Sequence, residues 1–251
     1  MQDSKEYKKR KEFFNSLITL YGRNSVVEVL QDESVDIHRV HLSKTNREEG
    51  VIKKIITLAK KRDIELLYHD KAALSRISKN AKQDQGVAID IVAKNYASAD
   101  DITTLKESTL RFIALDGIQN PQNLGMIIRS CAAGNIDGII LPKRNSAKLS
   151  PLVMKASAGT LFKIPIYYCE SLEETLLKLS DFEIYQLSSY AKESIYDNIS
   201  SSKSVFVLGN ESEGITKEVA KLCKKSLSIP MQRGVESLNV AVTAALIAFM
   251  R

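Results

Sequence analysis

The sequence predicts an α/β protein with two domains. Short apolar patterns typical of strands alternate with amphipathic patterns typical of helices, which favours sheets flanked by helices. The chain has 251 residues, more than one average domain, and its 44% hydrophobic and 26% charged residues are typical of a globular protein. We expect a basic segment at residues 1–20, an α/β domain at 21–93, a connection at 94–108 and a second α/β domain at 109–251.

The first half shows alternating short elements. Lysine and arginine precede an apolar run between residues 5 and 20, and the spacing predicts a basic segment that merges into a helical apolar face. Beyond it we expect a helix at 25–30, a strand at 37–42, a helix at 48–62, a strand at 64–69, a helix at 72–77 and a strand at 86–92.

The second half has the alternation of a parallel sheet. Strands are predicted at 111–116, 137–141, 164–168, 183–188, 204–209 and 226–230. Helices are predicted from near Asn123, at 151–159, at 172–179, at 216–223 and from about Leu238. The polar stretch before the first of these strands is the expected connection between the domains.

Three unusual loops follow strands of the second half: DGIQNPQNLG, GNESEG and PMQRGVES. Ligands of parallel α/β sheets bind outside the carboxyl ends of the strands, so we expect these loops to converge on one site. No G-x-G-x-x-G fingerprint follows a strand. In GNESEG, Ile215 replaces the lysine of a P-loop, and Glu211 and Glu213 would repel phosphate, which argues against phosphoryl transfer.

Two residues of the first loop region have a predicted local role. Asn123 stands at a helix start, where its amide can cap free N–H groups. Arg129 lies among apolar neighbours, so we expect its stem to be buried and its guanidinium to need a carboxylate or phosphate partner. Glu211 is the natural candidate for that partner.

Composition narrows the class of partner. A net charge of +6 and a pI near 9.0 fit a ligand that bears phosphates. The three cysteines have neither disulfide nor zinc spacing, His38, His41 and His69 are expected to be structural, and no metal site is predicted. Without a signal peptide or a membrane span, we expect a cytoplasmic protein with no membrane partner.

The three loops and their flanks have the sequences D-G-I-Q-N-P-Q-N-L-G-M-I-I-R, V-L-G-N-E-S-E-G-I and I-P-M-Q-R-G-V-E-S-L-N-V. In this order they resemble the three motifs of the SpoU-type RNA methyltransferases of the SPOUT superfamily. The resemblance covers residues 110 to 251. It implies a trefoil-knotted α/β domain, S-adenosylmethionine as methyl donor, transfer to a ribose 2′-hydroxyl of RNA, and a homodimer.

The resemblance also implies roles for individual residues. The reacting centre would consist of Asn123, Arg129, Glu211, Ser237 and Asn239. The cofactor would be held by Leu208, Gly209, Ile229, Met231 and Leu238. RNA contacts are expected from Arg23, Asn24, Lys143 and Arg144. Because a guanidinium keeps its proton in proteins, we expect Arg129 to stabilise charge rather than to act as the base.

The N-terminal half, with GRNSVVEVL and QGVAIDI, is similar to the RNA-binding domain of ribosomal-RNA members of this family, itself related to a class of ribosomal proteins. Large-subunit ribosomal RNA is therefore the preferred substrate and transfer RNA the second.

The basic segment at residues 1–20 is either a solvated helix end or an RNA-contacting arm. The alternatives are an RNA-binding assembly protein without methyl transfer and an enzyme that methylates a base nitrogen. Three residues depart from the motifs of many family members: Gly234 stands one place later than the usual glycine, Ala241 replaces a serine, and Asp84 replaces a histidine.

Overall fold

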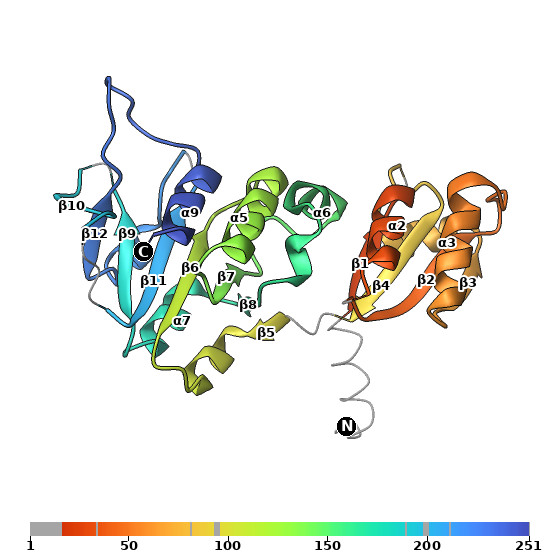
Figure 1. The fold of residues 1–251 in the computed structure, drawn as a ribbon, viewed down its shortest axis with the longest axis horizontal. Coiled ribbons are helices and arrows are strands. Elements are labelled where there is room, and N and C mark those ends of the chain that lie inside the picture. Colours follow the sequence, from red (N-terminus) through yellow and green to blue (C-terminus); the bar gives the residue numbers. More distant parts are fainter. Residues whose placement is uncertain are drawn as a thin grey trace. The chain divides into compact units, whose positions relative to one another are not determined.

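A computed structural model of the chain describes residues 17–33, 35–80, 82–92, 96–188, 190–197, 201–210 and 212–250. The chain divides into two compact units (Figure 1). The first comprises Met1–Lys94 with Leu149–Lys155, and the second comprises Asn95–Lys148 with Ala156–Arg251. Each unit has a sheet of its own.

The first unit contains a four-stranded sheet in the order β1-β4-β2-β3. Strands β1 and β2 run antiparallel to β4, and β3 runs parallel to β2. The strands are β1 (Leu17–Tyr21), β2 (Ile37–Ser43), β3 (Glu65–His69) and β4 (Val87–Val92), and the helices are α2 (Arg23–Gln31), α3 (Gly50–Lys61) and α4 (Lys71–Ser78).

Apolar spacing explains the core of this unit. Helix α3 buries Ile52, Ile55, Ile56 and Ala59, which recur at intervals of three and four residues and form one face of a helix. This face packs with α2, whose Val26, Val29 and Leu30 are also buried. The element alternation predicted for residues 25–92 is therefore confirmed.

Residues 17–20 differ from the sequence prediction. We expected them to continue a helical apolar face, but together with Tyr21 they form β1, which pairs along its length with β4. Three of the five residues of LITLY, namely Ile18, Thr19 and Tyr21, are β-branched or aromatic, which suits a strand. The rest of the predicted basic segment, residues 1–16, lies outside the described residues.

The second unit contains an eight-stranded sheet in the order β10-β12-β9-β11-β6-β7-β8-β5. Every neighbouring pair is parallel, which confirms the predicted parallel α/β class. The strands are β5 (Tyr96–Ser98), β6 (Leu110–Asp116), β7 (Gly138–Pro142), β8 (Ile166–Cys169), β9 (Glu183–Leu187), β10 (Glu193–Ser194), β11 (Lys203–Gly209) and β12 (Lys225–Ser228).

Helices flank this sheet, and two of them position the site. Helices α5 (Pro121–Ala133) and α9 (Val240–Ala248) lie side by side (Figure 1). At their far ends the Asn135 backbone N–H donates to the Ala248 carbonyl at 2.6 Å. The others are η1 (Ala99–Thr104), η2 (Thr160–Phe162), α7 (Leu172–Lys178) and α8 (Lys217–Ala220), whereas most of α6 (Pro151–Ser157) is grouped with the first unit.

Part of the expected connection at 94–108 is regular structure. Strand β5 pairs with β8 at the edge of the large sheet, and η1 follows it with a capping box between Ser98 and Asp101. Ala99 and Ile102 of η1 are buried in the core of the second unit. Among the described helices, none is long and apolar enough to span a membrane.

Candidate active site

The loops after β6 and β11 meet at one edge of the large sheet. The two strands are neighbours, with Gly209 in register with Asp116 at their carboxyl ends. The Asp116 carboxylate, which is almost fully buried, accepts a 2.6 Å hydrogen bond from the Thr216 backbone N–H. This bond ties the first motif to the second, as the position of both loops at the strand ends predicts.

The second-motif loop folds back on itself. The Asn210 side-chain oxygen accepts from the backbone N–H groups of Ser212 at 2.9 Å and Glu213 at 2.7 Å. A Cβ atom on Gly209 would lie 2.1 Å from the Gly214 carbonyl carbon, so only glycine fits there. Glu211, one of the predicted reacting-centre residues, lies outside the described residues.

A side-chain hydrogen bond joins the first motif to the third. The Asn239 amide donates to the Asn123 side-chain oxygen at 3.2 Å, across 116 residues of sequence. The Asn239 oxygen also accepts from the Ala241 backbone N–H at 2.9 Å and thereby caps α9. Two of the predicted reacting-centre residues are therefore in contact.

Asn123 is not the helix cap that we expected. The cap of α5 is Asn120, whose side chain accepts from the backbone N–H groups of Gln122 and Asn123. Pro121 directly after it occupies the first helical position, where its missing N–H costs nothing. Asn123 lies in the first turn and is only 6% exposed, so its amide is available to the third motif.

Arg129 is exposed, and the expectation of a buried stem is wrong. Met126, three residues earlier on the same face of α5, is 41% exposed, whereas Ile127 and Ile128 are fully buried. Neighbours in sequence therefore point to opposite sides of the helix. The expected pairing of Arg129 with Glu211 lies outside the described residues.

The third-motif segment lines a pocket at the same edge of the sheet. Between β12 and α9 this segment forms a long loop that extends from the sheet (Figure 1). The pocket contains four of the predicted cofactor and reacting-centre residues, namely Ile229, Met231, Ser237 and Leu238. The predicted Leu208 and Gly209 end β11, which β9 separates from β12.

Sequence reasoning did not name the rest of this lining: Leu187, Ser188, Glu236 and Thr243. The sequence did contain a signal for this lining, because Leu187 and Ser188 are the last two residues of the strand predicted at 183–188, and the carboxyl ends of parallel strands share one edge. The mixture of apolar side chains with hydroxyls and one carboxylate suits an adenosine with an amino-acid tail, which presents a flat apolar ring, hydroxyls and an ammonium group. The lining therefore fits S-adenosylmethionine.

The described residues do not favour thiol or metal chemistry. Burial raises the pKa of the Cys131 thiol to about 12, so this residue of α5 stays a thiol at neutral pH. Burial likewise raises the pKa of Cys223 to about 11. Within the described ranges, no group of three or more His, Cys, Asp or Glu side chains is arranged to hold a metal ion.

The predicted RNA contacts fall in two places. Lys143 and Arg144 follow β7 and are exposed, and Lys143 pairs with Glu170 at 2.6 Å, which lowers the pKa of that carboxyl. Arg23 and Asn24 begin α2 in the first unit.

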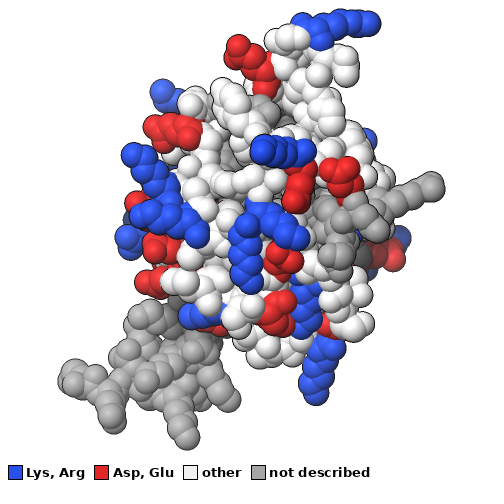
Figure 2. All heavy atoms as spheres, turned by 90° about the vertical axis from the view of Figure 1, so that its left-hand side faces the viewer, with Lys and Arg blue, Asp and Glu red and all other residues white. Residues whose placement is uncertain are grey.

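Viewed from the side of β10 and β12, the described Lys and Arg side chains are interspersed with Asp and Glu (Figure 2). The charge excess of the chain therefore forms no broad patch on that face.

Comparison with known proteins decides the family. The model of the SpoU rRNA methylase family matches residues 110–249, and that of the RNA 2′-O ribose methyltransferase substrate-binding domain matches residues 19–97. The chain belongs to the SpoU rRNA methylase family. It is accordingly an RNA methyltransferase with S-adenosylmethionine as methyl donor, as the sequence predicted.

Individual relatives agree with membership of the SpoU family. A protein of Bacillus subtilis named as a TrmH-family tRNA/rRNA methyltransferase is 30% identical over 91% of this chain and 92% of its own length. The AdoMet complex of the SpoU methyltransferase AviRb from Streptomyces viridochromogenes matches with a TM-score of 0.67, at 18% identity over 98% of this chain and 92% of that one. An AdoMet-bound rRNA methyltransferase from Sinorhizobium meliloti has a TM-score of 0.67, at 22% identity over 96% and 88%. These two structures support the SpoU fold.

Proposed function

We propose that this chain methylates a ribose 2′-hydroxyl of large-subunit ribosomal RNA, with transfer RNA as the second substrate class. The observation that supports it best is the Asn123–Asn239 hydrogen bond, which joins the first and third motifs close to the Ser237 and Leu238 pocket wall. The match of residues 19–97 to a substrate-binding domain supports RNA as the substrate. The extra N-terminal domain is what favours ribosomal RNA.

The reaction makes clear demands on the protein. When bound, S-adenosylmethionine would supply an electrophilic methyl group on a sulfonium: the ribose oxygen would bond to the methyl carbon, the carbon–sulfur bond would break to release the thioether product, and the hydroxyl proton would pass to solvent. Holding two reactants in line removes much of the entropic cost of the step. In this proposal the pocket residues Ile229, Met231 and Leu238 hold the methyl donor, with Leu208 and Gly209 completing the cradle.

The exposed Arg129 is assigned to the RNA. Its guanidinium stays protonated and can pair with a phosphate while it stabilises charge that develops on the ribose oxygen. Glu211 would orient it through a bidentate pair. Asn123 and Asn239 hold the first and third loops together, and Ser237 offers a neutral hydrogen bond from the pocket wall.

A homodimer, with the family's trefoil knot in each copy, is part of the same proposal. Val242 of α9 and Phe249 directly after it are 47% and 60% exposed, and both line a groove together with Ile195 and Tyr196. Exposed apolar surface of this kind marks an interaction site. Light scattering should give twice the mass of the 28.0 kDa chain; a monomer at micromolar concentration would contradict the dimer.

The decisive experiment combines labelled S-adenosylmethionine with RNA that lacks the modification. Ribosomal RNA and transfer RNA from a strain without the gene are incubated separately with the protein, and the labelled nucleotide is mapped. We expect label on a ribose oxygen of large-subunit ribosomal RNA. Label confined to transfer RNA would correct the substrate, and label on a base would refute the reaction. RNA affinity without binding of S-adenosylmethionine in calorimetry would instead indicate an assembly protein.

A further inference from the structure

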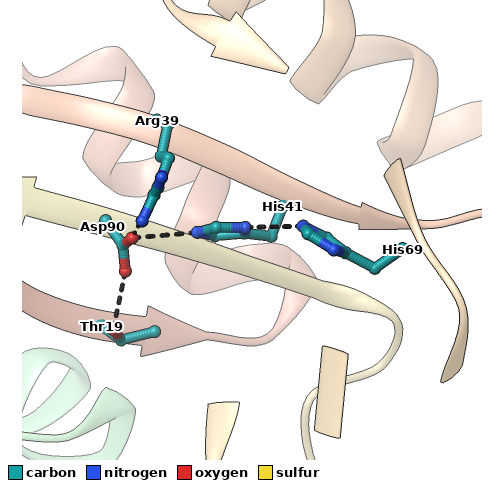
Figure 3. Close-up of polar contacts among 5 residues, drawn as sticks. All are labelled: Thr19, Arg39, His41, His69 and Asp90. Atoms are coloured by element: carbon teal, nitrogen blue, oxygen red, sulfur yellow. Dashed lines mark hydrogen bonds and ion pairs between the residues drawn. The ribbon is translucent and has the colours of Figure 1, made fainter. Parts of the chain in front are cut away.

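Five polar side chains cross the sheet of the first unit in a row (Figure 3). They come from all four strands in the order in which the strands are paired, β1-β4-β2-β3. Hydrogen bonds link Thr19 to Asp90 at 2.7 Å, Arg39 to Asp90 at 3.0 Å, His41 to Asp90 at 3.0 Å and His41 to His69 at 2.9 Å. The sequence had suggested only that these histidines are structural.

The carboxylate fixes where the protons lie. Hydrogen bonds from His41, Thr19 and Arg39 outweigh the burial of Asp90 and lower its pKa to about 2, so it is ionised and only accepts. The Nε2 atom of His41 must then carry the proton of the bond to Asp90. In the neutral ring the other nitrogen, Nδ1, is an acceptor, and the Nε2–H of His69 donates to it.

One more proton can enter this row without breaking it. His69 Nε2 faces His41, and its Nδ1 has no hydrogen-bond partner among the described residues. A proton added at that Nδ1 leaves the bonds from His69 to His41 and from His41 to Asp90 intact. The ring then changes from an acceptor to a cationic donor, and the Asp90 carboxylate supports its charge through His41.

The two histidines differ in access to solvent. His41 is 2% exposed, whereas His69 is only half-buried at the end of β3. Thr19, Arg39 and His41 already satisfy the buried carboxylate. A second imidazole at the surface is therefore unnecessary for holding Asp90, and its place at the outer end of the row is what makes a surface role possible.

The surroundings of His69 favour an anion. The charged groups that face it are Arg39 of β2, Lys44 after β2, Asp70 after β3 and, through His41, Asp90 of β4. Burial, then His41 and Arg39, and finally Lys44 lower the pKa of His69, while Asp70 raises it. The ring is thus neutral near pH 7, and an arriving negative charge would favour its protonation.

Lysine and arginine gather at the same edge of the sheet. Lys44 is exposed, and its backbone N–H donates to the His69 carbonyl at 2.8 Å. Arg23, after β1, is held by neutral oxygens, with Nε donating to the Gln85 carbonyl at 3.2 Å and Nη2 to the Asn46 side chain at 3.5 Å. Within the described ranges neither residue is in an ion pair, so both keep their charge available.

We propose that His69, with Lys44, binds a phosphate of the substrate RNA and takes up one proton as it does so. This inference rests on the proposed function, because RNA is the partner that brings the phosphate. The phosphate oxygen accepts the new Nδ1–H bond, and the pair of histidines with Asp90 acts as a proton-linked contact in the substrate-binding unit.

The sign of the pH dependence follows from linkage. If bound phosphate raises the pKa of His69, RNA affinity is greatest below the pKa of the free protein and falls as pH rises toward the pKa of the complex. One linked proton gives at most about a tenfold change in Kd for each pH unit within that window. The expected direction is tighter binding in mild acid.

The test measures Kd for a fluorescein-labelled stem–loop of ribosomal RNA with the full chain, between about pH 6 and pH 8. His69→Gln is the informative variant, because its amide can still donate to His41 but cannot gain a proton. We expect it to lose the pH slope and to bind about threefold to tenfold more weakly at the acid end. His38→Gln, on the same strand as His41, is the matched control and should keep the slope.

Two further measurements make the outcome decisive. Calorimetry in buffers of different ionisation enthalpy should show uptake of about one proton by the unchanged chain and less by His69→Gln. The same slope in both proteins would overturn the inference, whereas thermal melting checks that the variant is folded. RNA methylation without a His69-dependent slope refutes only this inference, and a His69-dependent slope without methylation refutes only the proposed function.

Discussion

Two pairs of polar side chains, one in each unit, differ in burial. In the second unit, Asn239 and Arg129 are exposed at or after strand ends, in the loops and helices that form the candidate site. In the first unit, His41 and Asp90 lie within central strands and are almost fully buried. A polar group in a loop can serve a ligand at little cost in stability, whereas a buried one must first satisfy its own hydrogen bonds. Substitutions should therefore separate activity from stability.

The largest effect is expected from Arg129→Ala. Loss of a charge-stabilising donor should lower methyl transfer by about 100- to 1,000-fold, equivalent to about 2.7–4 kcal/mol. Because Arg129 is exposed, the free energy of unfolding should change by less than about 0.5 kcal/mol. Methylation of RNA with labelled S-adenosylmethionine measures the first quantity and denaturant unfolding the second.

Arg129→Lys is the matched control for this pair of measurements. It keeps the charge but loses the planar fork that binds a phosphate through two hydrogen bonds. An intermediate rate is expected. Full activity in the lysine variant would exclude a strict guanidinium role, and a large loss of stability in the alanine variant would abolish the contrast between the units.

Asp90→Asn should act mainly on stability. It replaces the almost fully buried carboxylate that accepts from Thr19, Arg39 and His41, and it removes the negative charge that faces Arg39 and His41. We expect a loss of about 3 kcal/mol in the free energy of unfolding. Asp100→Asn, in an ion pair whose carboxylate is 65% exposed, is the control and should cost less than about 1 kcal/mol.

The Asp90 carboxylate should also make the stability of the chain depend on pH in acid. The pKa of Asp90 is about 2 in the folded chain against an ordinary 3.8, so its contribution is complete above about pH 4 and is lost as pH falls toward 2. Denaturant unfolding at several pH values checks this. The stability of Asp90→Asn should fall less steeply across that range; parallel curves would contradict the assignment.

The smallest effect is expected at Asn239, where two functions meet in one side chain. Asn239→Ala removes both the cap of α9 and the bond to Asn123, and should cost about 1 kcal/mol of stability together with activity. Asn239→Ser keeps a capping oxygen but is too short to reach Asn123. It should retain stability and still lose about tenfold in methyl transfer. Equal activity of the serine variant and the parent would show that only the cap matters.

Much of the site was predictable because it follows strand ends. The parallel sheet places the loops after β6, β11 and β12 at one edge, so the convergence of Asn123 with Asn239 follows from the order of strands. The cap at Asn120 could also have been predicted, since Pro121 directly after it marks the first helical position.

The rest depends on tertiary pairing. Thr19, Arg39, His41, His69 and Asp90 meet only because β4 lies between β1 and β2, and no local pattern shows that strand order. Strand β1 is likewise selected by its pairing with β4. Helical periodicity could have predicted the exposure of Arg129, since Met126 and Arg129 lie on one face of α5. Its apolar neighbours in sequence suggested burial instead.

The hydrogen bond between Asn123 and Asn239 joins two residues that the ribosome adds at different times. A ribosome synthesises about 5–20 residues per second, so the 116 residues that separate the two partners take on the order of ten seconds to appear. During that interval β6 and α5 can form without the segment that completes their site. If the proposed site is correct, the first motif of a nascent chain exists for several seconds before its partner in the third motif, and activity must wait until α9 has docked on α5.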